Sequence, residues 1–125
     1  MLKAIVAQRL IDGTGAEPLP EPIVLAREGR IEAIHSGTLA DLKLEEEVEA
    51  IECPGRTILP GLIDVHVHLA FSVEPTSAAI RWTLAQESEE TLALRALANA
   101  HVSLKGGITT VQDCGAKGFV VARVR

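Results

Sequence analysis

The chain has 125 residues, a formal net charge of −5 and a hydrophobic fraction of 47%. This acidic balance argues against a nucleic-acid-binding protein, for which a basic patch is expected. No uncharged apolar run reaches the roughly 18 residues of a membrane-spanning helix, and the first residues lack the apolar core of a secretion signal. We therefore expect a cytoplasmic protein with no nucleic-acid partner and no membrane partner.

The first half of the chain shows short β-strand patterns separated by turns. Apolar and polar residues alternate in several short runs, which glycine-containing pairs interrupt. Three neighbouring glutamates at residues 45–47 indicate a solvent-exposed face rather than a site. We expect strands at residues 3–8, 23–26, 30–35 and 49–53, turns at 12–15 and 28–29, and a short helix or solvated loop over 39–48.

A domain boundary is expected near Gly55. Pro54 and Gly55 follow the last of these strands, and both residue types interrupt regular secondary structure. The sequence therefore predicts a β-rich domain over residues 1–55 and a second domain over residues 56–125.

The segment LPGLIDVHVHL, residues 59–69, contains the residues best suited to a functional site. Its apolar run is typical of a strand buried on both faces of a parallel sheet. Side chains alternate along a strand, so His66 and His68 project from one face and can bind one metal ion, to which imidazole is well suited. Asp64 shares that face, and its carboxylate can accept the second ring N–H of a ligating histidine. An arbitrary HxH pair more often binds nothing, so the flanking residues decide the interpretation.

The residues after His68 change to a helical pattern. Pro75, Thr76 and Ser77 together form one helix start signal, and Ser88 is a second one. Lys105 followed by Gly106 and Gly107 is a suitable helix end. We expect one long helix or two stacked helices in this region. The face expected to pack on the sheet carries Ala93, Leu94, Leu97, His101 and Leu104, which makes His101 a packing residue rather than a ligand.

Residues 108–112 predict a second strand, which ends at Asp113 and Cys114. A strand, helix, strand order gives a right-handed crossover and a parallel pair of strands. Asp113 and Cys114 then lie at the same end of the sheet as the histidines and can line a site there. The alternative for Asp113 is a turn or helix cap, which is a common role for an aspartate at the end of a strand.

Three segments together resemble the amidohydrolase superfamily of metal-dependent hydrolases. They are LIDGTG at 10–15, LPGLIDVHVHL at 59–69 and GGITTVQDCG at 106–115, and they occur in the order found in that family. The branch they resemble most contains imidazolonepropionase-like and Xaa-Pro dipeptidase-like proteins. The resemblance implies an α/β fold with an N-terminal β-rich layer, part of a small β-sandwich, followed by the first βαβ unit of a TIM-type (β/α)8 barrel.

The resemblance also implies a chemistry for the HxH pair. In similar enzymes these histidines bind a catalytic divalent metal, zinc first among the candidates, in a centre of one or two ions. Metal-activated water then hydrolyses a C–N bond in a small amide, cyclic amide or peptide-like substrate. His66 and His68 take the ligand role here, and Asp64 supports them.

The chain is short for that fold, because a complete barrel needs about 250 residues. The ligands and general base that the family places on later strands have no counterpart among these 125 residues. We therefore expect an N-terminal fragment that is incomplete and inactive alone, either truncated or completed by other chains. The sequence leaves open the substrate, the number of metal ions and the oligomeric state.

Two other interpretations stay open. The first is a non-catalytic, self-associating module that retains the HxH motif by descent. The second treats the HxH pair as a metal clip between the chains of an oligomer. The first predicts association without metal, and the second predicts association that a chelator reverses.

Overall fold

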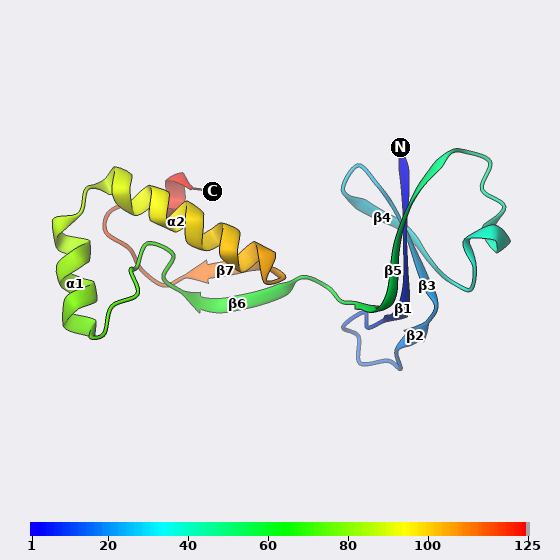
Figure 1. The fold of residues 1–125 in the computed structure, drawn as a ribbon, viewed down its shortest axis with the longest axis horizontal. Coiled ribbons are helices and arrows are strands. Elements are labelled where there is room, and N and C mark those ends of the chain that lie inside the picture. The colour runs from blue at the N-terminus through cyan, green and yellow to red at the C-terminus, as the bar shows by residue number, and fades with distance from the viewer. Residues whose placement is uncertain (125) are drawn as a thin grey trace. The chain divides into compact units, whose positions relative to one another are not determined.

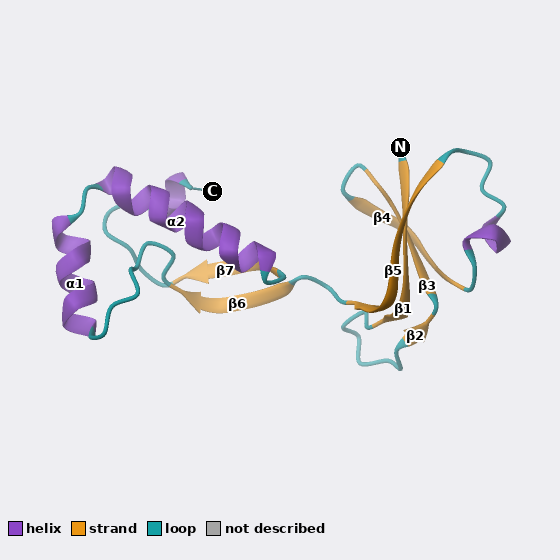
Figure 2. Cartoon of the chain, in the orientation of Figure 1, coloured by secondary structure: helices purple, strands orange, loops and turns teal. Residues whose placement is uncertain are grey.

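The computed structural model describes residues 1–124 and shows a mixed α/β protein. The chain divides into two compact units, Met1–Pro60 and a second unit that begins at Gly61. The first unit consists of strands and one short 3-10 helix, whereas the second contains two strands and both α-helices (Figures 1 and 2). Each unit has a hydrophobic cluster of its own. Across the described residues, no helix is long and apolar enough to cross a membrane.

The first unit is built on one five-stranded sheet around a central strand, β1. β1 pairs with β2 and β3 in antiparallel fashion and with β5 in parallel, and β3 continues the sheet to β4. A sandwich would require a second sheet facing this one, and residues 1–60 form one sheet. The strands are β1 (Leu2–Leu10), β2 (Leu19–Pro20), β3 (Pro22–Arg27), β4 (Arg30–Ser36) and β5 (Val48–Ile58).

The hairpin between β3 and β4 turns at the two residues that the sequence predicted. Glu28 and Gly29 both have positive φ values, 50° and 76°. Two-residue hairpin turns of the primed type need this conformation, because their twist matches the twist of the flanking strands. The segment after β4 forms a short 3-10 helix, η1 (Leu39–Leu42), and Leu39 and Leu42 pack on the cluster of Leu2, Ala4, Ile23 and Leu25.

The strand expected at residues 49–53 is longer than predicted. β5 continues through Pro54 and Gly55, where the pairing with β1 shifts: Ala7 faces Cys53 and Arg9 faces Thr57. Two extra residues on β5 are accommodated there, and Gly55 has a φ of 71°. A proline without an N–H is tolerated at such an irregularity and on an edge strand, so the strand does not end. The first compact unit accordingly extends to Pro60 rather than to Gly55.

In the second unit, β6 (Leu62–Val67) and β7 (Ile108–Asp113) pair in parallel, as the strand, helix, strand order predicted. Two helices connect them, α1 (Ser77–Gln86) and α2 (Glu89–Lys105), and α2 packs along β7 (Figure 1). A short 3-10 helix, η2 (Val121–Arg123), follows β7. The buried cluster of this unit consists of Leu92 and Ala96 on α2 together with Leu69, Ala70 and Val120.

The two helices begin at the predicted start signals, with Thr76 and Ser88 as their N-caps. The Thr76 hydroxyl accepts the N–H of Ala79 at 3.2 Å, and the Ser88 hydroxyl accepts the N–H of Thr91 at 3.3 Å. Each bond satisfies one of the N–H groups that the first turn of a helix leaves without a partner. α2 ends at Gly106, whose N–H reaches the carbonyls of Val102 and Ser103 at 3.0 Å.

The predicted buried face of α2 is wrong. Leu92 and Ala96 are completely buried, whereas Leu94 is 70% exposed and Leu97 is 56% exposed. His101, expected to pack on the sheet, is exposed as well. Apolar residues lie at helical spacing on both sides of this helix, so periodicity alone did not distinguish the side that Leu69 and Ala70 cover.

The apolar run of β6 is also less buried than expected. Ile63 and Val65 are each 67% exposed, although the sequence predicted burial on both faces. Within the described part of the chain, β7 pairs with one edge of β6 and the sheet has two strands. Gly61, just before β6, has no space for a side chain, because a Cβ at this position would overlap the side chain of Thr109 on β7.

Candidate functional site

The candidate residues gather where β6 and β7 end. The two strands run in parallel with Val67 opposite Asp113, and the Cys114 N–H extends the pairing by donating to the Val67 carbonyl at 2.8 Å. Parallel pairing brings the carboxyl ends of both strands to one edge of the sheet. His68 follows β6 directly, so the structure places this histidine beside the end of β7.

His66 and His68 lie close to each other. Their ring centroids are 5.2 Å apart and their ring planes meet at 77°, an edge-to-face arrangement. His66 is exposed to solvent and His68 is half-buried. A separation of this size is compatible with two imidazoles that share one ion.

The His68 ring is held from two sides. Its Nδ1 lies 3.1 Å from the carbonyl oxygen of Gly115. A carbonyl oxygen only accepts hydrogen bonds, so in a neutral ring this contact places the hydrogen on Nδ1 and leaves the lone pair on Nε2. The Phe71 ring stacks on the imidazole with a centroid distance of 4.2 Å and an interplanar angle of 9°.

Asp64 has a different partner from the one expected. Its Oδ1 accepts the main-chain N–H of His66 at 3.0 Å, whereas the sequence predicted a bond to a histidine ring. An aspartate side chain is short and readily reaches the N–H two residues further along its own chain. Asp64 therefore stabilises the backbone at His66.

Asp113 accepts two main-chain hydrogen bonds at the edge of the site. Its Oδ2 accepts the Leu69 N–H at 2.8 Å and its Oδ1 accepts the Gly115 N–H at 2.9 Å. The role as a turn cap, left open by the sequence, is therefore present, and the same carboxylate also joins the ends of β6 and β7. Cys114 is exposed, and its Sγ lies 3.7 Å from the carbonyls of Val65 and Gln112.

Sequence reasoning missed the side chains of α2 that hold the loop after His68. The Asn99 Nδ2 donates to the Leu69 carbonyl at 2.7 Å and to the Phe71 carbonyl at 3.3 Å. Arg95 donates to the Ala70 carbonyl, between them, at 3.3 Å. Three successive carbonyls are therefore bound by one helix. Asn99 falls at helical spacing from Leu92 and Ala96, and a polar residue on that face was the signal available in the sequence.

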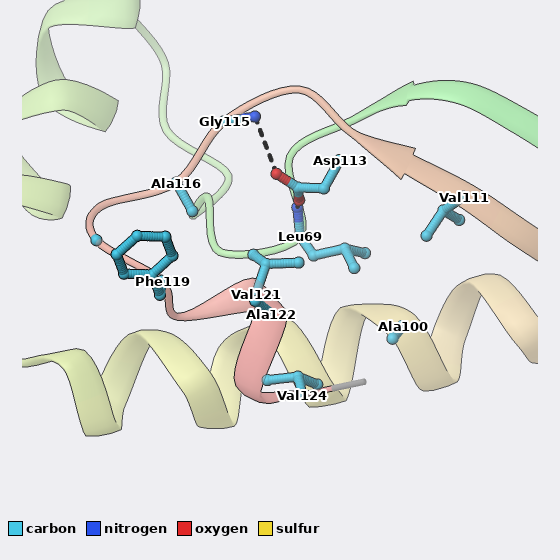
Figure 3. Close-up of a pocket in the computed structure, with 11 residues that line it drawn as sticks. Leu69, Ala100, Val111, Asp113, Gly115, Ala116, Phe119, Val121, Ala122 and Val124 are labelled. Atoms are coloured by element: carbon cyan, nitrogen blue, oxygen red, sulfur yellow. Dashed lines mark hydrogen bonds between the residues drawn. The ribbon is translucent and has the colours of Figure 1, made fainter.

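Two hollows border the strand ends. One has a volume of about 620 Å³ and is lined by His68, Phe71, Leu84, Ala85, Cys114, Gly115, Ala116 and Lys117. The other, of about 490 Å³, is bordered by Val111, Asp113, Phe119 and the η2 segment; Figure 3 shows Asp113 at its edge, bonded to the Gly115 N–H. In the first hollow, the residues that lie around the His68 ring are mostly apolar.

Within residues 1–124, no group of three or more His, Cys, Asp and Glu side chains is arranged to hold a metal ion. His66 and His68 are therefore a set of two nitrogen donors in this part of the chain. Their imidazoles nevertheless fit a metal in donor type, in proximity and in the tautomer that the Gly115 carbonyl requires for His68.

The comparisons with known proteins all indicate the same family. The Amidohydrolase family profile matches residues 57–124. The chain is 33% identical to the imidazolonepropionase of Methylobacterium nodulans over 125 aligned positions, which cover 82% of this chain and 30% of that protein. It is 42% identical to the dihydroorotase of Bacillus caldolyticus over 82 positions, covering 62% of this chain and 16% of that protein.

Among solved structures, a Xaa-Pro dipeptidase with methionine bound in its active site matches this fold. The TM-score is 0.78 with 28% identity, and the match covers 100% of this chain and 29% of the dipeptidase chain. The chain thus spans less than a third of the length of each of these three relatives. The superfamily resemblance carried by the HxH segment is confirmed.

Proposed function

The chain belongs to the amidohydrolase family, and we propose that it takes part in hydrolysing a C–N bond in a small amide, cyclic amide or peptide-like molecule. Its relatives named imidazolonepropionase, dihydroorotase and Xaa-Pro dipeptidase are hydrolytic enzymes of that family. The observation that carries the proposal is the HxH pair, with two rings 5.2 Å apart at the end of a parallel strand. Sites of barrel enzymes lie at the carboxyl ends of the strands.

We propose that His66 and His68 supply two ligands to a divalent metal, zinc first among the candidates. When bound, such an ion supplies a Lewis acid that polarises a carbonyl and lowers the pKa of water. A catalytic zinc usually has three protein ligands, so the proposed centre needs at least one donor in addition to these two histidines. Amidohydrolases are generally metal-dependent.

The other residues of the site position these ligands. The Gly115 carbonyl fixes the orientation of the His68 ring, and Phe71 limits its rotation by stacking. Asn99 and Arg95 hold the carbonyls of the loop after His68. The hollow beside His68 contributes a mostly apolar wall, which suits an apolar group of a substrate. Cys114 and Lys117 are the polar exceptions on that wall.

The architecture follows from the same family membership. We propose that β6, the two helices and β7 form the first βαβ unit of a TIM-type barrel. The sheet of Met1–Pro60 is then part of a β-sandwich. The parallel pairing of β6 with β7 supports the barrel assignment.

A second candidate function is a non-catalytic module that associates with copies of itself. The exposed apolar side chains of β6, Ile63 and Val65, favour this alternative. Among the described residues β6 pairs on one edge only, and an open strand edge with apolar side chains promotes association. Size-exclusion chromatography with light scattering distinguishes the alternatives. Association that a chelator does not alter supports the module, whereas association lost on chelation supports a metal clip between chains.

The test of the metal proposal is a zinc titration of metal-free protein by calorimetry, with metal analysis after dialysis. Wild type is expected to bind zinc, and the double variant His66→Ala, His68→Ala is expected to lose binding. His101→Ala is the matched control, because that histidine is exposed on α2 and should leave binding unchanged. Failure of the wild type to bind any divalent metal, or retention of binding by the double variant, would overturn the proposal.

The hydrolytic step is tested with the zinc-loaded protein on N-acyl amino acids, dipeptides that end in proline and cyclic amides. Any turnover should follow metal content across protein prepared at different zinc loadings. Turnover that is equal in zinc-loaded and chelated protein would contradict a metal-dependent hydrolase.

A further inference from the structure

We propose that Asp113 is a positioning residue for His68, and that it acts through the Gly115 carbonyl to select the ring tautomer whose Nε2 can bind a metal. This inference rests on the proposed ligand role of His68. It assigns to Asp113 a task beyond lining the site or capping a turn.

The carboxylate connects both neighbours of the histidine. Its Oδ2 accepts the N–H of Leu69, the residue directly after His68, at 2.8 Å. Its Oδ1 accepts the N–H of Gly115 at 2.9 Å, and the carbonyl of that same glycine receives the His68 Nδ1–H at 3.1 Å. The hydrogen bonds thus form a closed ring from His68 through Leu69, Asp113 and Gly115 back to the imidazole.

Only a carboxylate satisfies this arrangement fully. Both contacts at Asp113 come from main-chain N–H donors, so both side-chain atoms must accept. An asparagine offers one accepting oxygen and one NH2 group that only donates. In Asp113→Asn, one N–H would therefore face another N–H, and either Leu69 or Gly115 would lose its partner.

Gly115 transmits the effect because its backbone conformation is unusual. Its φ is 151°, in the positive range that favours glycine. A Cβ at this position would lie 3.9 Å from Cε1 and 4.0 Å from Nδ1 of His68, which is ordinary contact. The hydrogen bond that the Gly115 N–H donates to Asp113 stabilises this conformation. In it, the Gly115 carbonyl lies against Nδ1 of His68.

The tautomer matters because a neutral imidazole can carry its hydrogen on either nitrogen. With the hydrogen on Nδ1, Nε2 keeps its lone pair and can act as a ligand. With the hydrogen on Nε2, that nitrogen cannot bind a metal. Hydrogen bonds of this kind behind a ligand typically contribute about 10- to 100-fold to metal affinity.

The experiment compares wild type with Asp113→Asn in the metal-free protein. Long-range 1H–15N spectra report the tautomer of each histidine at alkaline pH, where the ring is neutral, and a His68→Gln variant assigns the signals. We expect the Nδ1–H form of His68 in wild type and a mixture of forms in Asp113→Asn. Zinc affinity should fall about 10- to 100-fold in the variant.

Asp41→Asn is the matched control. The Asp41 carboxylate also accepts a main-chain N–H, from Thr38 at 3.1 Å, but it lies in the first compact unit. This substitution should change neither the His68 tautomer nor zinc affinity. Asp113→Glu keeps the carboxylate and should restore part of the Nδ1–H population.

Several outcomes would overturn the proposal. An Nε2–H tautomer at His68 in wild type rejects it without any variant, which keeps the test valid even if Asp113→Asn fails to fold. An unchanged tautomer in folded Asp113→Asn also rejects it. If the tautomer responds as expected but wild type binds no zinc, tautomer selection by Asp113 is supported and the proposed metal centre is rejected.

Discussion

Arg95 donates through both terminal nitrogens of its guanidinium to the two carboxylate oxygens of Glu87, each at 2.5 Å. The pair links the second turn of α2 to Glu87, the C-cap of α1, and Arg95 also reaches the Ala70 carbonyl. Both side chains are about three-quarters covered, with exposures of 23% for Arg95 and 24% for Glu87. The pair thus supports the loop that follows His68.

This pair predicts a pH dependence of stability. The Arg95 guanidinium holds the pKa of the Glu87 carboxyl below its ordinary value of 4.5. The folded state therefore favours the ionised carboxylate, and its contribution is present above pH 4.5 and is lost as the pH falls through the lower, folded pKa. Urea unfolding should show Glu87→Gln less stable than wild type at neutral pH, with the difference shrinking in acid.

Glu46→Gln is the comparison for that measurement. Glu46 pairs with Arg27 at 2.5 Å, and Arg27 likewise lowers the pKa of its carboxyl. Its side chain is 49% exposed, so water and salt screen the pair more strongly. The loss at neutral pH should be smaller than in Glu87→Gln, and a larger loss would show that burial does not govern these pairs.

Leu92→Ala should destabilise the second unit strongly. Leu92 is completely buried in the cluster with Leu69, Ala70, Ala96 and Val120. Truncation of such a side chain removes its transfer energy and leaves a cavity, at a cost of about 2–5 kcal/mol. Leu94→Ala, two residues along the same helix and 70% exposed, should change the unfolding free energy by less than about 0.5 kcal/mol. Equal effects in chemical denaturation would contradict the observed face of α2.

Gly61→Ala should disturb the start of β6. A Cβ at Gly61 would overlap the Thr109 side chain, which branches at its own Cβ and has little freedom to move. Overpacking of this kind costs about 1–3 kcal/mol. The double variant Gly61→Ala, Thr109→Ala should recover part of that loss, because the substitution removes the Thr109 hydroxyl and methyl. A double-mutant cycle without any coupling would show that the two residues do not meet.

Asn99→Asp should weaken the loop after His68 with little change in side-chain size. The Asn99 NH2 group donates to the carbonyls of Leu69 and Phe71, and an ionised aspartate can only accept. A buried carbonyl that loses its partner costs about 1–3 kcal/mol, and these two are partly buried, so we expect the lower end of that range. Amide hydrogen exchange should show faster opening of residues 69–71. Protection equal to that of wild type would contradict the role of Asn99.

Turns, helix starts and short motifs could be predicted from the sequence because their causes act over a few residues. The turn at Glu28 and Gly29 follows from backbone preferences, and the starts of both helices follow from the hydroxyls of Thr76 and Ser88. The parallel pairing of β6 with β7 follows from the order of the elements. The HxH segment likewise indicates the family by its residues alone, because a motif is a property of neighbouring positions.

The sequence alone determined most of the elements, their order, the histidine pair and the family to which the chain belongs. Only the tertiary structure decided which face of α2 is buried, that β5 passes through Pro54 and Gly55, and that Asn99 holds the loop after His68. The ring of hydrogen bonds through Asp113 also appears only there. Each of these depends on groups far apart in the chain, such as Leu69 with Asp113. Their meeting is set by packing between elements, which local sequence patterns do not encode.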